Sequence, residues 1–182
     1  MVKTHPIPCT KEEMSRLINA SIEKDFYYML FMTAKTTGRR LGEYYDVQIK
    51  DIDFDKGIMI TKVLKRKRRV EKEALLTEEV SRIIKQYVLK NKMKLEDYLF
   101  RKVTIRQIQY AVKKYAKKAE IPHNVMFHNF RHYFITELVR LGWTYDRIAK
   151  LTGHSSVGTL VHYDHAVASD LKEDAMIALK EL

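Results

Sequence analysis

The 182-residue sequence predicts a mixed α+β fold that is mainly α-helical, with a small three-stranded antiparallel sheet at one edge. Segments with apolar residues at helical spacing outnumber the strand-like segments. The three strand-like segments follow one another directly along the chain, which favours antiparallel pairing between neighbours. No repeat and no linker rich in Gly, Ser or Pro interrupts the sequence, so residues 1–182 are expected to form a single domain.

Three helices are predicted in the first quarter of the chain. Thr10 and Glu13 form a capping box, which opens an amphipathic helix. A more apolar helix follows at 26–37 and ends near Gly38, because glycine readily adopts the left-handed conformation that stops many helices. A short helix is expected at 39–46. The apolar face of the first helix carries Met14, Leu17, Ile18 and Ile22.

The sheet is predicted from strands at 47–54, 58–63 and 70–75, with a turn at 55–57 between the first two and a basic tip between the last two. Helices follow to the end of the chain. Thr77 caps one of them, and Thr104 with Gln107 forms a second capping box. The expected helices of this part are 77–92, 104–119, 128–141, 144–151, 156–163 and 169–181.

The charge of the chain points to a polyanionic partner. Lys and Arg number 34 against 23 Asp and Glu, which leaves a net charge of +11. A merely soluble basic surface is the alternative, but the basic residues are clustered, as expected of a surface that tracks a phosphate backbone. The first cluster comprises Lys62, Lys65, Arg66, Lys67, Arg68 and Arg69, and the second comprises Lys113, Lys114, Lys117 and Lys118.

Several classes of protein are excluded by composition. No apolar run approaches the roughly 20 residues needed to cross a bilayer, and the N-terminal residues lack the apolar core of a signal peptide. Cys9 is the only cysteine, which excludes an internal disulfide and a zinc site built from cysteines. A reducing cytoplasm is therefore the expected compartment, with no membrane partner.

Side chains able to hold and attack a phosphate recur near the C-terminus, at His128, Arg131, His154 and Tyr163. A guanidinium matches two phosphate oxygens with a planar fork of donors. A phenol has a free pKa near 10, and cationic neighbours favour the phenolate, which can form a covalent intermediate. Far upstream, Arg40 begins a predicted helix and could supply a second guanidinium.

Gly38-x-Arg40-x-x-Glu43, His128-x-x-Arg131-His132, Gly153-His154 and Tyr163 resemble, in order and spacing, the signature of the tyrosine recombinases, the phage integrase family. The resemblance runs from about Thr10 to the end of the chain. It implies the catalytic-domain fold of that family, with the usual N-terminal core-binding domain absent from residues 1–182. The implied activity is site-specific DNA recombination of the integration or excision type, as in mobile elements.

The resemblance also implies a role for each residue. Tyr163 would attack the DNA, form a 3′-phosphotyrosyl bond and release a 5′-hydroxyl. Arg40, Arg131 and His154 would hold the scissile phosphate, and His128 would assist proton transfer at the tyrosine. Neither a metal nor any other cofactor is implied, because the phosphotyrosine stores the energy for rejoining.

Two further positions support this set. Glu43 would support the site without doing chemistry, and a lysine on the hairpin would protonate the leaving 5′ oxygen. Lys65 fits the spacing from the first arginine, whereas Lys62 fits a local Thr-Lys pattern, and Lys67 is a third candidate. We expect Lys65, with Lys62 as the alternative. The DNA-binding residues expected on the hairpin are Lys62, Lys65, Arg66, Lys67, Arg68 and Arg69.

The expected partner is double-stranded DNA, bound by a tetramer of subunits on paired sites, although a monomer is also possible. Two other functions share the signature: DNA relaxation by a type IB topoisomerase, and DNA binding by a catalytically silent member of the same fold. Single residues also have simpler interpretations. Tyr163 could be a core aromatic residue, and His128 with His132 has zinc-ligand spacing, although Asn129 stands where a metalloprotease carries Glu.

The sequence departs from the family pattern at two positions. Arg39 stands where an apolar residue usually lies, and Thr152 stands where the family often has leucine. Arg39 could add a phosphate contact, but the favoured interpretation is a solvated surface charge. Neither departure removes a catalytic atom.

Overall fold

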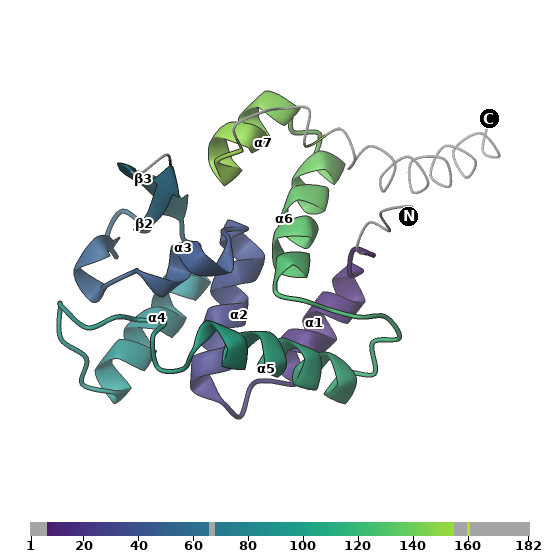
Figure 1. Cartoon of the computed structure of the whole chain (residues 1–182), viewed down its shortest axis with the longest axis horizontal. Coiled ribbons are helices and arrows are strands. Elements are labelled where there is room, and N and C mark those ends of the chain that lie inside the picture. The colour runs from purple at the N-terminus through teal and green to yellow at the C-terminus, as the bar shows by residue number, and fades with distance from the viewer. Residues whose placement is uncertain (1–6, 66–67, 155–159, 161–182) are drawn as a thin grey trace. The chain divides into compact units, whose positions relative to one another are not determined.

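The computed structural model describes residues 7–65, 68–154 and 160, and contacts within the chain form two compact units, residues 1–133 and 134–182. The mainly helical α+β fold is confirmed. The predicted helices at 156–163 and 169–181 lie outside the described residues. In chain order the elements are α1 (Lys11–Asn19), α2 (Asp25–Thr37), α3 (Leu41–Tyr45), the 3₁₀ helix η1 (Ile49–Asp51), β1 (Ile52–Asp53), β2 (Ile58–Lys65), β3 (Arg68–Leu75), α4 (Glu78–Lys90), α5 (Ile105–Lys118), α6 (His128–Arg140) and α7 (Tyr145–Thr152) (Figure 1).

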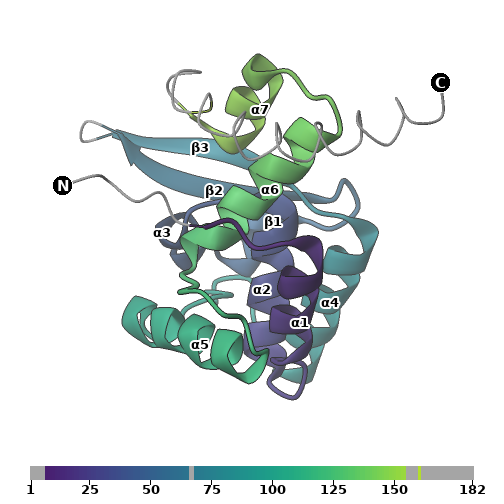
Figure 2. The same cartoon turned by 90° about the vertical axis from the view of Figure 1, so that its right-hand side faces the viewer.

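The sheet has the predicted antiparallel order β1-β2-β3. β2 and β3 form one long ribbon, whose pairing runs from Ile58 opposite Leu75 to Lys65 opposite Arg68 (Figure 2). Both strands are longer than the sequence predicted, so the basic segment belongs to the paired ribbon as well as to its tip. β1 pairs only with the first two residues of β2.

The predicted strand at 47–54 is wrong in its first half, where the chain forms η1. The Asp51 carboxylate accepts a hydrogen bond from the backbone N–H of Gln48 at 2.9 Å, which closes a tight turn. The next two backbone N–H groups donate to carbonyls of the loop after α4, at Asp97 and Leu95, instead of to a neighbouring strand. Local side-chain capping therefore overrides the apolar alternation of this segment.

The first predicted helix is also shorter than expected. α1 begins with the predicted capping box, in which Glu13 N donates to Thr10 Oγ1 at 3.1 Å, but it ends at Asn19. Ile22, which the sequence assigned to the apolar face, is 57% exposed beyond that end. The Ser21 hydroxyl donates to Ile18 O at 2.7 Å, so it satisfies a backbone carbonyl of the last helical turn.

The core of the first unit surrounds α2, which lies among α1, α4 and α5 in Figure 1. Met29, Leu30 and Phe31 are fully buried in consecutive positions, because helices pack on α2 from more than one side. Phe31 packs against Phe130 of α6, with ring centroids 5.1 Å apart. This packing fixes the C-terminal end of α2, from which the candidate site begins.

The second unit has a separate small core. It contains apolar side chains of the C-terminal part of α6 and of α7, together with the buried Leu160. Among the described residues, no helix is both long enough and apolar enough to span a bilayer.

Candidate active site

The candidate site is organised around the end of α2. Gly38 stops the helix in the left-handed conformation, with φ at 57°, and its N–H donates to Ala34 O at 3.0 Å. The predicted helix stop at this glycine is therefore confirmed. Arg39 and Arg40 follow at once and lead into α3, so the corner at Gly38 sets where both guanidinium groups start.

A buried chain of hydroxyl groups holds this corner. The Thr37 hydroxyl lies 2.7 Å from Thr33 O and 2.6 Å from the Tyr44 hydroxyl, and Arg39 N donates to that phenol at 3.0 Å. Because Thr37 has only one hydroxyl proton, which it donates to Thr33 O, the phenol must donate to Thr37 and accept from Arg39. Burial raises the pKa of Tyr44, so this phenol keeps its proton.

Arg131 joins α6 to the same corner. Its Nη1 donates to Gly38 O at 2.8 Å across 93 residues, and the side chain is 1% exposed. A charged donor strengthens this bond relative to a neutral one. Two arginines that the sequence assigned to the phosphate, Arg40 and Arg131, thus lie at one corner of the first unit.

His128 lies one helical turn before Arg131 on α6. Partial burial lowers the pKa of His128, and the positive charges of Arg131 and Arg40 lower it further. The imidazole is therefore neutral at neutral pH and able to accept a proton. Its ring packs edge to face on His132, with centroids 4.6 Å apart.

Glu43 orients Arg40. The Arg40 Nη1 lies 3.2 Å from Glu43 Oε1, one turn along α3, and the arginine side chain is 49% exposed whereas that of the glutamate is only 6% exposed. The other carboxylate oxygen, Oε2, is buried and has no hydrogen-bond partner among the described residues. A buried carboxylate that holds a half-exposed guanidinium fits the supporting role expected for Glu43.

Arg39 is buried, so the favoured expectation of a solvated surface charge is wrong. The side chain is 2% exposed, and its Nη2 donates to Glu73 O of β3. Within the described part of the chain, its Nε and Nη1 have no acceptor. Burial lowers the pKa of Arg39, although the nearby Glu43 opposes that shift. The family's apolar residue at this position was the signal that the site is buried.

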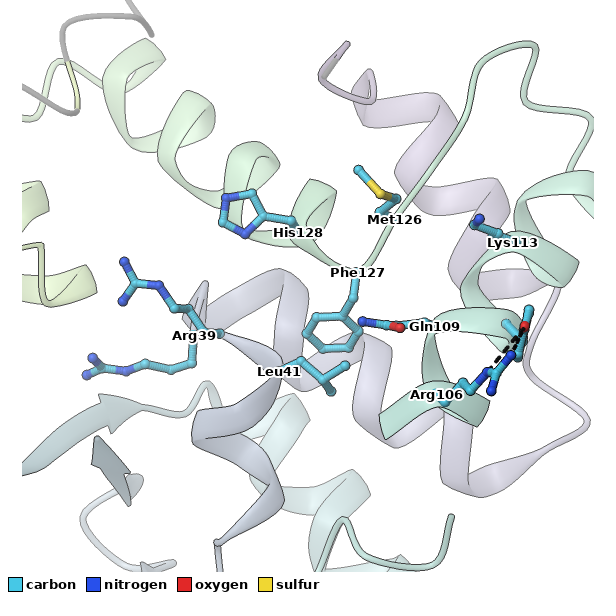
Figure 3. A pocket seen from close by; sticks show the side chains of 10 residues that line it. Arg39, Leu41, Arg106, Gln109, Lys113, Met126, Phe127 and His128 are labelled. Atoms are coloured by element: carbon cyan, nitrogen blue, oxygen red, sulfur yellow. Dashed lines mark hydrogen bonds between the residues drawn. The ribbon is translucent and has the colours of Figure 1, made fainter. Parts of the chain in front are cut away.

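Arg39 and Arg40 line a hollow of about 410 Å³ (Figure 3). Figure 3 shows Arg39 and His128 on one side of it, and Arg106 and Lys113 of α5 on the other. Arg106 is held by the hydroxyl of Tyr110, which lies 3.1 Å from its Nη2. Arg106 was not among the expected site residues, although its spacing of seven residues from Lys113 places both on one face of α5. Every ionisable side chain lining the hollow is basic or a phenol, which suits an anionic ligand.

Of the two candidate catalytic lysines on the hairpin, only Lys62 has a side chain within the described part of the structure. Lys62 Nζ contacts both carboxylate oxygens of Asp51, at 2.9 and 3.0 Å. Lys65 is the last residue of β2, with its backbone opposite Arg68, and its side chain lies outside the described part of the structure. The same holds for the side chains of Arg66, Lys67, Arg68 and Arg69.

The second unit holds His154. α7 ends at Gly153 in the left-handed conformation, with φ at 74°, which fixes the start of the next residue. The Thr152 hydroxyl lies 2.6 Å from Ile148 O and 2.6 Å from His154 Nδ1. Because its single proton goes to the carbonyl, the hydroxyl accepts from Nδ1–H. Thr152, a departure from the family pattern that removes no catalytic atom, therefore selects the imidazole tautomer.

The described structure thus gathers Arg40, Glu43, His128 and Arg131 in the first unit and places His154 in the second. Tyr163 lies outside the described residues. Among the residues that the structure does describe, the one group of three potential metal ligands contains none of these side chains, and His128 with His132 forms no such group.

Comparisons with known proteins agree with the sequence signature. The Phage integrase family model matches residues 9–169. Tyrosine recombinase XerA of Pyrococcus furiosus is 32% identical over 184 residues, covering 94% of this chain and 61% of that protein. Tyrosine recombinase XerC of Caldanaerobacter subterraneus subsp. tengcongensis is 31% identical over 182 residues, covering 93% of this chain and 50% of that protein. The chain therefore spans between half and two thirds of these relatives.

Solved structures show the same fold. The crystal structure of XerA recombinase matches with a TM-score of 0.81 at 28% identity, covering 98% of this chain and 65% of that one. The XerH site-specific recombinase bound to a palindromic difH substrate matches with a TM-score of 0.76 at 20% identity, covering 94% of this chain and 53% of that one. The second likeness concerns the fold alone.

We predict that Thr152→Val removes the preference of the His154 imidazole for the tautomer with its proton on Nδ1. Valine keeps the shape of threonine but removes the acceptor for Nδ1–H. Imidazole ¹⁵N NMR, recorded where the ring is neutral, should show the Nδ1–H form in the unaltered protein and a loss of that preference in the variant. Thr144→Val is the matched control, because Thr144 makes no side-chain cap on the same helix. An unchanged tautomer in Thr152→Val would contradict the assignment.

Proposed function

Because the chain belongs to the phage integrase family, we propose that it is the catalytic domain of a tyrosine recombinase, which cuts and rejoins double-stranded DNA at specific sites. The observation that carries this proposal is the corner at Gly38, where Arg40 and Arg131 meet with His128 beside them. Two guanidinium groups and an imidazole supply the charge and proton acceptor that transfer of a phosphoryl group to a phenol requires.

Cleavage follows from these roles. The Tyr163 phenol attacks the scissile phosphorus, a tyrosyl O–P bond forms, and the bond from phosphorus to the 5′ oxygen breaks. Arg40, Arg131 and His154 bind the non-bridging oxygens, whose charge grows in the transition state. The neutral imidazole of His128 accepts the phenol proton, which its lowered pKa allows.

Protonation of the leaving oxygen completes cleavage. The hairpin lysine, Lys65 with Lys62 as the alternative, donates a proton to the departing 5′ oxygen and leaves a free hydroxyl. Rejoining reverses these steps: the lysine takes the proton of a 5′-hydroxyl from a second DNA strand, which attacks the phosphotyrosine, and His128 returns its proton to the displaced Tyr163. No metal or nucleotide takes part, since the bond energy is kept in the covalent intermediate.

DNA binding is proposed for the basic surfaces. The hollow bounded by Arg39, Arg40, Arg106 and Lys113 would take phosphates next to the cleaved one, and the hairpin residues 62–69 would follow the backbone farther along. We place the protein in the cytoplasm, as a tetramer on paired DNA sites, with residues 1–182 as one catalytic domain. No observation on the described residues favours topoisomerase-like relaxation or a catalytically silent role.

Tyr163→Phe is expected to abolish the covalent adduct while leaving DNA affinity within a few-fold of the original. The phenylalanine keeps the ring but removes the attacking oxygen. Nicked suicide DNA, which loses a short fragment on cleavage and so traps the intermediate, would be incubated with each protein and run on a denaturing gel. Persistence of the adduct in Tyr163→Phe would contradict the nucleophile assignment.

The catalytic lysine can be identified with a DNA substrate whose leaving atom is sulfur, because a thiolate leaves without being protonated. Lys65→Ala is expected to slow cleavage by about 10²–10⁴-fold, the usual contribution of a general acid. A substrate with sulfur at the bridging 5′ position should restore the rate, because a thiolate leaves more easily than an alkoxide.

Lys62→Ala needs a control, because it also leaves Asp51 without its ion pair. Asp51→Asn breaks the same pair and keeps the lysine. If sulfur rescues Lys62→Ala and not Lys65→Ala, the alternative lysine is the catalytic one and the assignment of Lys65 is wrong.

Arg39→Leu is expected to weaken DNA binding without lowering the stability of the folded protein. Removing a buried guanidinium whose Nε and Nη1 have no acceptor among the described residues should leave the free energy of unfolding unchanged or raise it by about 1 kcal/mol. DNA affinity should fall, and the slope of log affinity against log salt should decrease by about 1. Arg82→Leu, which removes an exposed arginine of α4 outside the hollow, is the control of equal charge. Equal salt slopes in both variants would rule out the proposed contact.

A further inference from the structure

Three side chains with metal-ligating atoms lie close together in the first unit, outside the candidate active site around Gly38. Cys9 precedes the N-cap of α1, Glu13 lies in the first turn of that helix, and His123 belongs to the loop between α5 and α6. One ligand atom from each lies within 4.8 Å of the other two. The thiol, the carboxylate and the imidazole are therefore brought together from positions up to 114 residues apart, counted from 9 to 123.

The cluster is largely shielded from water. Cys9 is 4% exposed, and the side chains of His123 and Glu13 are 14% and 13% exposed. Thr10 N and His123 Nε2 both bond to Glu13 Oε2, at 2.9 and 3.2 Å, so neither of them uses the second carboxylate oxygen. The capping box thus holds the carboxylate in place beside the imidazole.

The contacts of the chain leave this cluster incompletely satisfied. His123 Nδ1 is buried and has no hydrogen-bond partner among the described residues. His123 Nε2 faces Glu13 Oε2, so the unpartnered Nδ1 lies on the other side of the ring, where it costs free energy. A metal ion bound between Nε2 and the Glu13 carboxylate would take the place of their hydrogen bond, and it would also give the buried thiol a partner.

We propose that Cys9, Glu13 and His123 form a zinc site, completed by a water molecule. Sulfur, nitrogen and one carboxylate oxygen form a ligand set that suits Zn²⁺, whereas Mg²⁺ and Ca²⁺ take oxygen ligands almost exclusively. A single cysteine excludes a site built from several cysteines, but it does not exclude a mixed site of this kind.

The geometry requires only a small closure. Zinc–ligand bonds of about 2.0–2.3 Å place the ligand atoms of a tetrahedral site about 3.3–3.8 Å apart. The side chains, now within 4.8 Å, would close by about 1 Å, which rotations of Glu13 and His123 can supply. His123 also lines a surface hollow of about 430 Å³, which gives an ion and its water a route to the imidazole.

The ion would fasten the segment before α1 to the loop that leads into α6. That loop is already tied to the same segment, because the Asn129 amide donates to Ile7 O at 2.8 Å and its oxygen accepts from Met126 N at 2.9 Å. Zinc would add a stronger link in parallel and limit the movement of the residues just before His128. The role is structural, and it holds whether or not the proposed recombinase activity is correct.

The test uses the full 182-residue chain, purified without a metal-binding tag and treated with a chelator. Equilibrium dialysis against Zn²⁺ with elemental analysis should give one zinc ion per chain. Co²⁺ bound in its place should show a thiolate-to-cobalt charge-transfer band. Zinc should also raise the unfolding temperature as its concentration rises.

Conservative variants decide whether these three residues are the ligands. Cys9→Ser, His123→Gln and Glu13→Gln should each weaken zinc binding by more than about 100-fold, beyond the roughly 10–100-fold lost with a merely supporting hydrogen bond. Glu13→Gln can keep the capping box, so it removes a ligand without removing the helix cap. Glu12→Gln, on an exposed residue of the same turn, should bind zinc as the unaltered chain does.

Three results would overturn the proposal. The first is that the chain binds no zinc. The second is a cobalt spectrum without the thiolate band, and the third is zinc binding by Cys9→Ser and His123→Gln that equals that of Glu12→Gln. The last result would place the ion on other histidines.

Discussion

The hydrogen bond from Arg131 to the carbonyl of Gly38 is the interaction on which the first unit's site depends. It joins residues 93 positions apart and ends on a carbonyl whose direction is set by a left-handed glycine. Arg40 begins two residues later, and the buried phenol of Tyr44 fixes the peptide between them. Tyr44 in turn packs edge to face on Phe127, the residue before His128, with centroids 5.9 Å apart. The backbone of α2 and the first turn of α6 are thereby held in one arrangement.

This arrangement places positively charged guanidinium groups in the protein interior, where water cannot hydrate them. Arg39 is almost fully buried, its Nε and Nη1 have no acceptor among the described residues, and the buried carboxylate close to Arg39 and Arg40 is that of Glu43. A set of buried donors that exceeds its acceptors destabilises the folded chain relative to an apolar packing of the same shape. A bound phosphate would accept hydrogen bonds from these donors. The stability that the free protein lacks would then contribute to the free energy of binding. Natural proteins accept such local conflicts mainly at functional positions.

Local chemistry made much of the fold predictable. The capping boxes at Thr10 and Thr104 and the glycine stop at Gly38 have short-range causes, and the structure confirms each of them. The strand expected at 47–54 failed because the Asp51 carboxylate made a turn that the apolar pattern does not encode. The motif arginines could be named from their spacing, but the burial of Arg39 and the bond from His154 to Thr152 depend on neighbours supplied by folding. Tyr163, the residue that defines the signature, lies outside the described structure and stays a prediction.

The hydroxyl chain at the end of α2 also bears on how this corner could change during evolution. Replacing Thr37 alone would leave the buried Tyr44 proton without its acceptor, and replacing Tyr44 alone would strand the N–H of Arg39. Each single replacement therefore lowers stability, and replacing both side chains by apolar ones still leaves the Arg39 N–H without an acceptor. Substitutions at these two positions, seven residues apart, should therefore be non-additive in their effects on stability, which limits the order in which either position can change.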